Sequence, residues 1–350
     1  MADTVAIHIG QPKAASTALQ HALSDARVVL AQHDIHYPLR DGATEHIAEF
    51  ADLQLQWIRP GSDNTRGFAR AVHNAVPGSW EALKTRTRDL RGHVLVSDET
   101  LYEFSSGAAN HVVSSLSEGR PERVAVVVVA RPVHGLLPSM YGQMARDSVL
   151  PSFETWLRAS LAMHLSASAR YEHWSAVVPH VVDVWRSTGA EVRTVPYGTD
   201  ADFGAQLSTA LGIAPAIPSL RLQRVNVSLG AATIAAWQRY LRAVGVKGFD
   251  PHVWRRLKRW RKSTEAIAFE AASGRLALTA EVCELVDAAF PSLSPGALEW
   301  PEATEVERAK AALKARLADT APMTGPPPDP ALVSLIYESM RDHLAAAGSH

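Results

Sequence analysis

Cysteine is nearly absent from this chain of 350 residues, in which Cys283 is the only one. An internal disulfide is therefore excluded, and a single thiol is typical of a reducing cytoplasm. No apolar run reaches the roughly 18 residues needed to cross a bilayer, and the first residues lack the basic segment of a secretory signal. The 35 lysines and arginines balance 36 aspartates and glutamates, giving a net charge of −1. We therefore expect a cytoplasmic protein that has neither nucleic acid nor an integral membrane among its partners.

Short apolar segments alternate with helical patterns in the first part of the chain. Residues 123–130, RVAVVVVA, form a continuous apolar run, which is typical of a central parallel strand covered on both faces. Further strands are predicted at 4–10, 93–97 and 191–197, and helices at 16–33, around 134–146 and near 200–211. This alternation predicts an α/β fold over residues 1–225, with a parallel central sheet flanked by helices.

The character of the sequence changes after about residue 225. Residues 226–350 read as a mainly helical part that completes or covers the site of the α/β core. Within this part, the stretch 320–330, TAPMTGPPPDP, is rich in proline and is predicted to be a linker. A last amphipathic helix comes after it.

A candidate phosphate-binding loop lies between the first strand and the first helix. The first amide groups of a helix lack partners, and the helix dipole there favours an anion. Glycine and small residues let the backbone approach a ligand, a lysine adds a positive charge, and hydroxyls add donors. The loop residues that we expect to bind the ligand are Gly10, Pro12, Lys13, Ala14, Ala15, Ser16 and Thr17.

This loop departs from the common P-loop pattern G-x-x-x-x-G-K-S/T. No glycine comes directly before Lys13, and Ala14 and Ala15 separate that lysine from the hydroxyls of Ser16 and Thr17. The hydroxyl that would hold Mg²⁺ beside a P-loop lysine is therefore misplaced. An ordinary strand–turn–helix with a surface lysine is the alternative interpretation of the loop.

Two other strand ends carry residues that suit the same edge of the sheet. Arg131 comes directly after the apolar run and Ser139 comes eight residues later, a pair that could bind a phosphate monoester. Glu99 comes after the strand 93–97 and could accept a proton from a hydroxyl. The alternatives are a surface arginine at a sheet edge and an acidic first turn that caps a helix.

Taken together, these segments resemble the sulfotransferases that use 3′-phosphoadenosine 5′-phosphosulfate (PAPS), especially bacterial members. QPKAASTALQ is similar to their loop P-K-T/S-G-T/S-T/S-x-L-Q, with Ala15 in place of the usual glycine. Arg131 and Ser139 match the spacing of the family's 3′-phosphate site. PSMYGQMAR, HVLVSDE, RVNVSL (224–229) and DIHYP resemble further family segments, and the resemblance covers about residues 4–230.

The resemblance implies a P-loop-related sulfotransferase fold and transfer of a sulfuryl group from PAPS, with 3′-phosphoadenosine 5′-phosphate (PAP) as the product and no metal requirement. Lys13 would stabilise the leaving phosphate. Glu99 is the first choice as base, and His46 is the second, because the family uses either residue type. The acceptor would carry a hydroxyl and could be a glycan, a lipid-linked sugar or a secondary metabolite. His8 lies mid-strand and is expected to be a core histidine with its hydrogen bonds satisfied, and His36 is expected in a loop.

Two other functions stay open at this point. A P-loop-type kinase acting on a small molecule would use ATP and Mg²⁺, and a non-catalytic relative would bind a nucleotide without turnover. The stretch 253–263, VWRRLKRWRKS, contains six cations and two tryptophans. Three interpretations apply to it: a nucleic-acid or membrane surface, a solvated helix face with Trp254 and Trp260 buried, or a basic lid over PAPS or an anionic acceptor.

Overall fold

The computed structural model divides the chain into two compact units. The first comprises Met1–Pro132, Glu172–Val225 and Pro291–Pro301, and the second comprises Val133–Tyr171, Asn226–Phe290 and Glu302–His350. The structure describes residues 3–11, 14–57, 72–166, 178–198, 201–222, 229–245, 251–291 and 301–346. One division falls at Val225, where the sequence predicts a boundary, but residues 133–171 belong to the second unit and residues 291–301 belong to the first.

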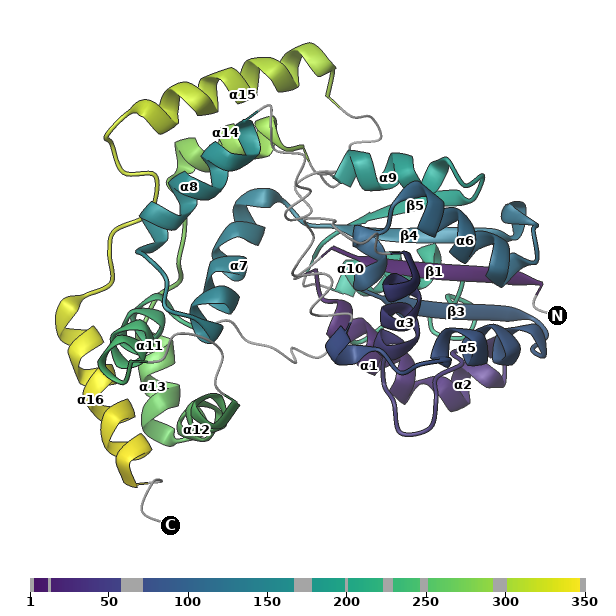
Figure 1. The fold of residues 1–350 in the computed structure, drawn as a ribbon, viewed down its shortest axis with the longest axis horizontal. Coiled ribbons are helices and arrows are strands. Elements are labelled where there is room, and N and C mark those ends of the chain that lie inside the picture. Colours follow the sequence, from purple (N-terminus) through teal and green to yellow (C-terminus); the bar gives the residue numbers. More distant parts are fainter. Residues whose placement is uncertain are drawn as a thin grey trace. The chain divides into compact units, whose positions relative to one another are not determined.

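A five-stranded, all-parallel sheet forms the centre of the first unit (Figure 1). The order is β2-β3-β1-β4-β5, and the strands are β1 (Thr4–Gly10), β2 (Ile35–His36), β3 (His93–Asp98), β4 (Val124–Ala130) and β5 (Glu191–Pro196). The predicted α/β fold with a parallel sheet and a mainly helical C-terminal part is confirmed. The prediction that His36 lies in a loop is wrong, because His36 pairs with Val94 as part of the short strand β2.

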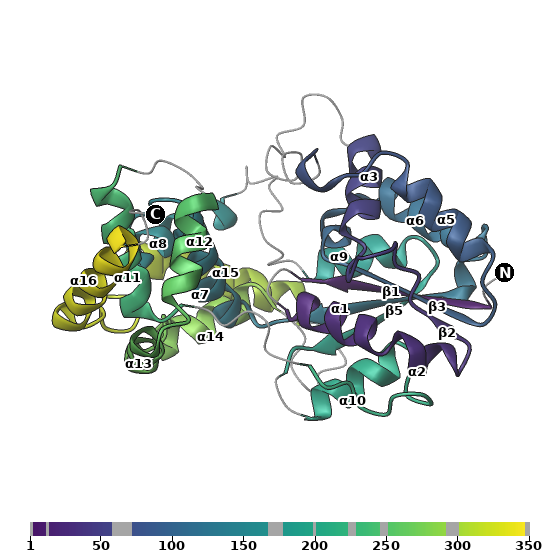
Figure 2. The ribbon, with the colours of Figure 1, turned by 90° about the horizontal axis from the view of Figure 1, so that it is seen from below.

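Helices cover both faces of this sheet, as Figure 2 shows. On one face, Val5, Ile7 and Ile9 of β1 pack with α3 (Ile47–Trp57), α5 (Ser79–Arg88), α6 (Ser106–Ser117) and α9 (Val178–Arg186). On the other face, Ala6 packs with α1 (Ser16–Asp25), α2 (Arg27–Ala31) and α10 (Ala201–Ala210). Burial on both faces explains why β1 and β4 are nearly continuous apolar runs. The single helix predicted over 16–33 is two helices, separated at Ala26.

The described part of the second unit is built from helices. They are α7 (Val133–Asp147), α8 (Phe153–Leu165), α11 (Ala231–Ala243), α12 (Pro251–Trp260), α13 (Thr264–Ala272), α14 (Ala280–Ala289), α15 (Ala303–Ala318) and α16 (Pro330–Ala346). Trp237 of α11 is buried, and its indole N–H donates to the carbonyl of Arg146 on α7 at 3.1 Å. This packing against later helices explains why α7 belongs to the second unit although it precedes residue 225.

The proline-rich stretch predicted as a linker is fastened to the second unit. The Glu154 carboxylate on α8 accepts the backbone N–H groups of Met323 and Thr324 at 3.0–3.2 Å. The Arg158 guanidinium donates to the carbonyl oxygens of Leu317, Asp319 and Ala321. Met323 is fully buried. The stretch connects α15 to α16 and is held against α8 at Met323 and Thr324.

Among the described helices, none is both long enough and apolar enough to cross a membrane.

Candidate functional site

Three predicted segments of the site lie at the ends of three neighbouring strands. β1 lies between β3 and β4, with Ile9 opposite Asp98 and Gly10 opposite Val129. The chain leaves β1 toward the β2 side of the sheet and leaves β4 toward β5, so the order reverses between β1 and β4. In open α/β sheets, ligands bind outside the carboxyl ends of the strands at such a reversal. The loop after Gly10, Glu99 after β3 and Arg131 after β4 all lie at this edge.

The loop after β1 leads into a helix start that no side chain caps. Ala15 is the residue before α1, and its φ of 65° and ψ of 16° place it in the left-handed region. Its side chain offers no capping hydrogen bond to α1, so the first amide groups of the helix are available to an anion. Ala14 is buried, Thr17 is half-buried, and the predicted ligands Pro12 and Lys13 lie outside the described residues.

Gly10 and Ser16 are in direct contact at the base of the loop. A Cβ added to Gly10 would lie 1.7 Å from Ser16 Oγ, which no real structure tolerates. The glycine is therefore required for the Ser16 side chain to lie over the end of β1. Ser16 is buried, and its Oγ has no hydrogen-bond partner within the described ranges. A buried hydroxyl of this kind beside uncapped amides is suited to an anionic ligand.

Arg131 is held at the end of β4 by two residues that the sequence did not single out. Its backbone N–H donates to Gln11 Oε1 at 2.6 Å, which ties the end of β4 to the loop after β1. Its guanidinium lies over the ring of Tyr197, with Cζ 4.9 Å from the ring centroid. Burial lowers the pKa of Arg131, and Tyr197 acts in the opposite direction. A guanidinium over an aromatic face is attracted to the ring, which helps to hold Arg131 at this strand end.

Ser139 is half-buried on α7. This helix belongs to the second unit, whereas Arg131 belongs to the first. The pairing of the two residues stays a prediction.

The end of β3 places two acidic residues in different roles. Asp98 is buried, and its Oδ1 accepts both the backbone N–H and the hydroxyl of Thr100 at 2.6 Å. Glu99 is half-buried and immediately precedes the short helix η1 (Thr100–Glu103). The sequence left open that this acidic turn caps a helix. Asp98 has that role, and Glu99 stays a candidate base.

His46 is placed in the core rather than at an open surface. It is fully buried, and burial lowers its pKa from 6.5 to about 3. Its Nδ1 accepts the backbone N–H of Ser97 at 3.3 Å, and the ring of Tyr37 meets it edge-on with centroids 4.8 Å apart. A neutral imidazole engaged in this way lacks access to an acceptor, so the geometry favours Glu99 over His46 as the base.

Ser97 connects the elements around the site. The Gln20 side chain of α1 donates to its carbonyl at 3.1 Å, and its Oγ lies 2.8 Å from His8 Nδ1. His8 is buried in mid-strand as predicted, but it is not a satisfied core histidine, because its Nε2 has no hydrogen-bond partner among the described residues. These contacts join α1, β1 and β3 directly beneath the loop. None of them was foreseen from the sequence, because the partners are far apart along the chain.

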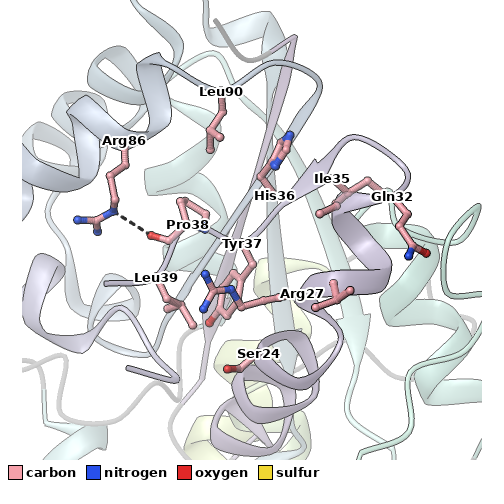
Figure 3. A pocket seen from close by; sticks show the side chains of 12 residues that line it. Ser24, Arg27, Gln32, Ile35, His36, Tyr37, Pro38, Leu39, Arg86 and Leu90 are labelled. Carbon is pink, nitrogen blue, oxygen red and sulfur yellow. Dashed lines mark hydrogen bonds between the residues drawn. The ribbon is translucent and has the colours of Figure 1, made fainter. Parts of the chain in front are cut away.

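A separate cavity of about 870 Å³ lies beside β2 (Figure 3). Its wall contains Arg27, Tyr37 and Arg86. Arg86 donates to the Pro38 carbonyl at 3.3 Å and forms an ion pair with Glu49 at 3.0 Å. Among the described residues that are predicted to bind the donor, none lines this cavity. It shares Tyr37 with the surroundings of His46 and is otherwise distinct from the strand-end site.

The basic stretch 253–263 is partly described. Leu257 and Trp260 are buried in the second unit, whereas Lys258, Arg259 and Lys262 are exposed. This agrees with a solvated helix face for these residues. The side chain of Trp254 lies outside the described part.

Among the described residues, no group of three or more histidine, cysteine, aspartate or glutamate side chains is placed to hold a metal ion. No family model, curated protein or solved structure matches this chain. The chemistry of the strand-end residues is therefore what points to a function.

Proposed function

We propose that this chain is a PAPS-dependent sulfotransferase that moves a sulfuryl group onto a hydroxyl of a carbohydrate or small-molecule acceptor. The observation that carries the proposal is the placement of two anion-binding groups on either side of the strand reversal. One is the loop after Gly10, with the uncapped start of α1. The other is Arg131 after the neighbouring strand β4. Gln11 connects the two.

Two anion sites at neighbouring strand ends suit a nucleotide with phosphate groups at both ends. PAPS has a 5′-phosphosulfate and a 3′-phosphate, and it supplies the activated sulfuryl group. The loop with Lys13, Ser16 and Thr17 would hold the 5′ end. Arg131, which lies over the Tyr197 ring, would hold the 3′-phosphate together with Ser139. The bare backbone at Gly10 and the buried Ser16 hydroxyl support this assignment of the loop.

Different residues would assist the separate steps of an in-line transfer of the sulfuryl group. Glu99 takes the proton from the acceptor hydroxyl as its oxygen bonds to sulfur. Lys13 and the first amides of α1 stabilise the charge that develops on the bridging oxygen as the sulfur–oxygen bond breaks. That oxygen keeps the electron pair and leaves with PAP. Each of these steps uses protein groups, and none of them requires a metal.

The acceptor is proposed by class alone, as a hydroxyl-bearing glycan, lipid-linked sugar or secondary metabolite. The proposed location of the reaction is the cytoplasm, in keeping with the single cysteine, Cys283.

A thermal-shift comparison of PAP, ADP and ATP, each with and without Mg²⁺, tests the proposal. A ligand that binds the native state stabilises it by RT ln(1 + [L]/Kd), which is about 2.7 kcal/mol at 100 times Kd. We expect PAP to raise the unfolding temperature without Mg²⁺, and by more than ADP. Equal shifts with PAP and ADP would remove the 3′-phosphate from the proposal. A response confined to ATP with Mg²⁺ would favour the kinase, and binding of PAP without turnover of PAPS would favour the non-catalytic relative.

A further inference from the structure

The side chains of Ser16 and His8 both lie close to Gly10, and each contains a buried polar atom without a described partner. A Cβ on Gly10 would be 1.7 Å from Ser16 Oγ and 3.2 Å from His8 Cε1. Ser16 is 3% exposed, and His8 is fully buried. Neither Ser16 Oγ nor His8 Nε2 has a hydrogen-bond partner in the part of the chain that the structure describes. Burial of an unpaired polar group is unfavourable, so this arrangement requires an explanation.

The other nitrogen of the His8 ring is anchored. Nδ1 lies 2.8 Å from Ser97 Oγ, whereas the Tyr37 hydroxyl donates to the Thr44 carbonyl at 3.5 Å. Burial lowers the pKa of His8 to about 3, so the ring is neutral at working pH. A neutral imidazole has one N–H and one lone pair. If Nδ1 accepts the Ser97 hydroxyl proton, Nε2 carries the N–H and is available as a donor.

We propose that His8 is a positioning residue of the donor loop. With an anion in the loop, His8 Nε2–H donates to Ser16 Oγ and thereby turns the Ser16 hydroxyl proton toward the bound phosphate. Donation then runs in one direction from Ser97 through His8 and Ser16 to the ligand, and a chain of this kind strengthens each of its bonds. The inference rests on the proposed function for the identity of the ligand.

A purely structural role makes a different prediction. In that case His8 joins β1 to β3 through Nδ1 and Ser97, and the group at the Nε2 position has no effect on ligand binding. The two roles are distinguished by which ring nitrogen matters, because asparagine places a polar group near the position of Nδ1 and glutamine places one near Nε2.

The first measurement is the affinity for PAP, by isothermal titration calorimetry, of His8→Asn and His8→Gln. We expect His8→Asn to weaken binding about three- to tenfold, the range for loss of one hydrogen bond. His8→Gln keeps a donor near Nε2 and should bind within about twofold of the unchanged protein. Unfolding temperatures of both variants show whether each is folded. Equal affinities for the two folded variants, or weaker binding by His8→Gln, would overturn the proposal.

A double-mutant cycle supplies a second measurement. If His8 acts through Ser16, then His8→Asn combined with Ser16→Ala should bind PAP no more weakly than Ser16→Ala alone. Arg131→Ala is the matched control. Its fold-loss of PAP affinity should multiply with the fold-loss caused by His8→Asn, because the two residues act independently. If the losses of PAP affinity in His8→Asn and Ser16→Ala also multiply in the double variant, the two residues are not coupled and the proposal is contradicted.

Repeating the cycle with inorganic pyrophosphate distinguishes failure of the proposed function from failure of the proposed role of His8. Binding of pyrophosphate without a preference for PAP would refute the sulfotransferase proposal, and the cycle would still decide the role of His8. A chain that binds neither probe would refute both proposals.

Discussion

The His46 side chain accepts the Ser97 backbone N–H in the position where a neighbouring strand would supply a carbonyl. Its Nδ1 accepts the Ser97 backbone N–H at 3.3 Å. The short strand β2 pairs with β3 no further than Val94, so a side chain supplies the bond that a longer β2 would have made. A buried N–H left without such an acceptor costs about 1–3 kcal/mol. The main role that the structure supports for His46 is therefore to hold the end of β3 in place.

The first prediction concerns acid stability. Burial lowers the pKa values of His8 and His46 from 6.5 to about 3. The unfolded chain therefore binds more protons than the native protein between these values, and the free energy of unfolding falls as the pH drops below 6.5. Each histidine contributes up to about 1.4 kcal/mol per pH unit within this window. Urea unfolding at several pH values between 4 and 8 measures the slope.

His46→Asn keeps an acceptor for the Ser97 N–H and removes the titrating ring, so it should flatten this slope. The exposed His33→Gln is the matched control. An unchanged slope in His46→Asn would show that His46 is not the buried neutral group described above.

The second prediction concerns the residue before α1. Ala15 has a φ of 65°, a conformation that costs an L-residue roughly 1–2 kcal/mol. Glycine adopts it freely but loses about 0.5–1 kcal/mol through its more flexible unfolded state. Ala15→Gly should therefore raise the free energy of unfolding by about 0.5–1 kcal/mol. Ala22→Gly, within α1, is the control and should lower it by about 1 kcal/mol. A loss of stability in Ala15→Gly would contradict the left-handed conformation.

The sequence predicted those parts of the fold that depend on long apolar runs. β1, β3, β4 and β5 were foreseen within a residue or two. β1 and β4 are apolar along most of their length because they are buried on both faces, whereas β5 is an edge strand that is mostly half-buried. β2 was missed because two residues carry no periodicity. The loop was found through its lysine, hydroxyls and small residues. The left-handed conformation of Ala15 was not foreseen.

The contacts behind the site could not be read from the sequence. Gln11 bonds to Arg131 across 120 positions, and His46 bonds to Ser97 across 51. Such pairs depend on which strands become neighbours, and a single sequence does not give the strand order. His46 looked suitable as a base because histidine titrates near neutrality. Its burial, which removes that property, is a result of tertiary packing.

The third prediction concerns Arg131. Arg131→Ala should weaken PAP binding but leave ADP binding nearly unchanged, because ADP lacks the 3′-phosphate. A charged hydrogen-bonded contact of this kind contributes roughly 1.5–3 kcal/mol, which corresponds to about a 10- to 150-fold loss of affinity. Titration calorimetry with both nucleotides measures it, and the exposed Arg88→Ala is the control. If both nucleotides weaken equally, Arg131 has a structural role and the 3′-phosphate site lies elsewhere.

The last prediction separates the two acidic residues at the end of β3. Glu99→Gln should lower turnover of PAPS by about 10²–10⁴, the usual contribution of a general base, with PAP affinity and stability unchanged. Asp98→Asn should instead lower stability, because the buried Asp98 carboxylate accepts two hydrogen bonds from Thr100. Turnover is measured as release of PAP from PAPS with a panel of glycan and phenol acceptors, beside the unfolding temperature of each variant. If Glu99→Gln stays active while folded His46→Asn is inactive, Glu99 is not the base and His46 must reach the acceptor through a movement that exposes it. If Glu99→Gln loses stability and PAP binding together with turnover, the carboxylate supports the end of β3 and the proton acceptor is another group.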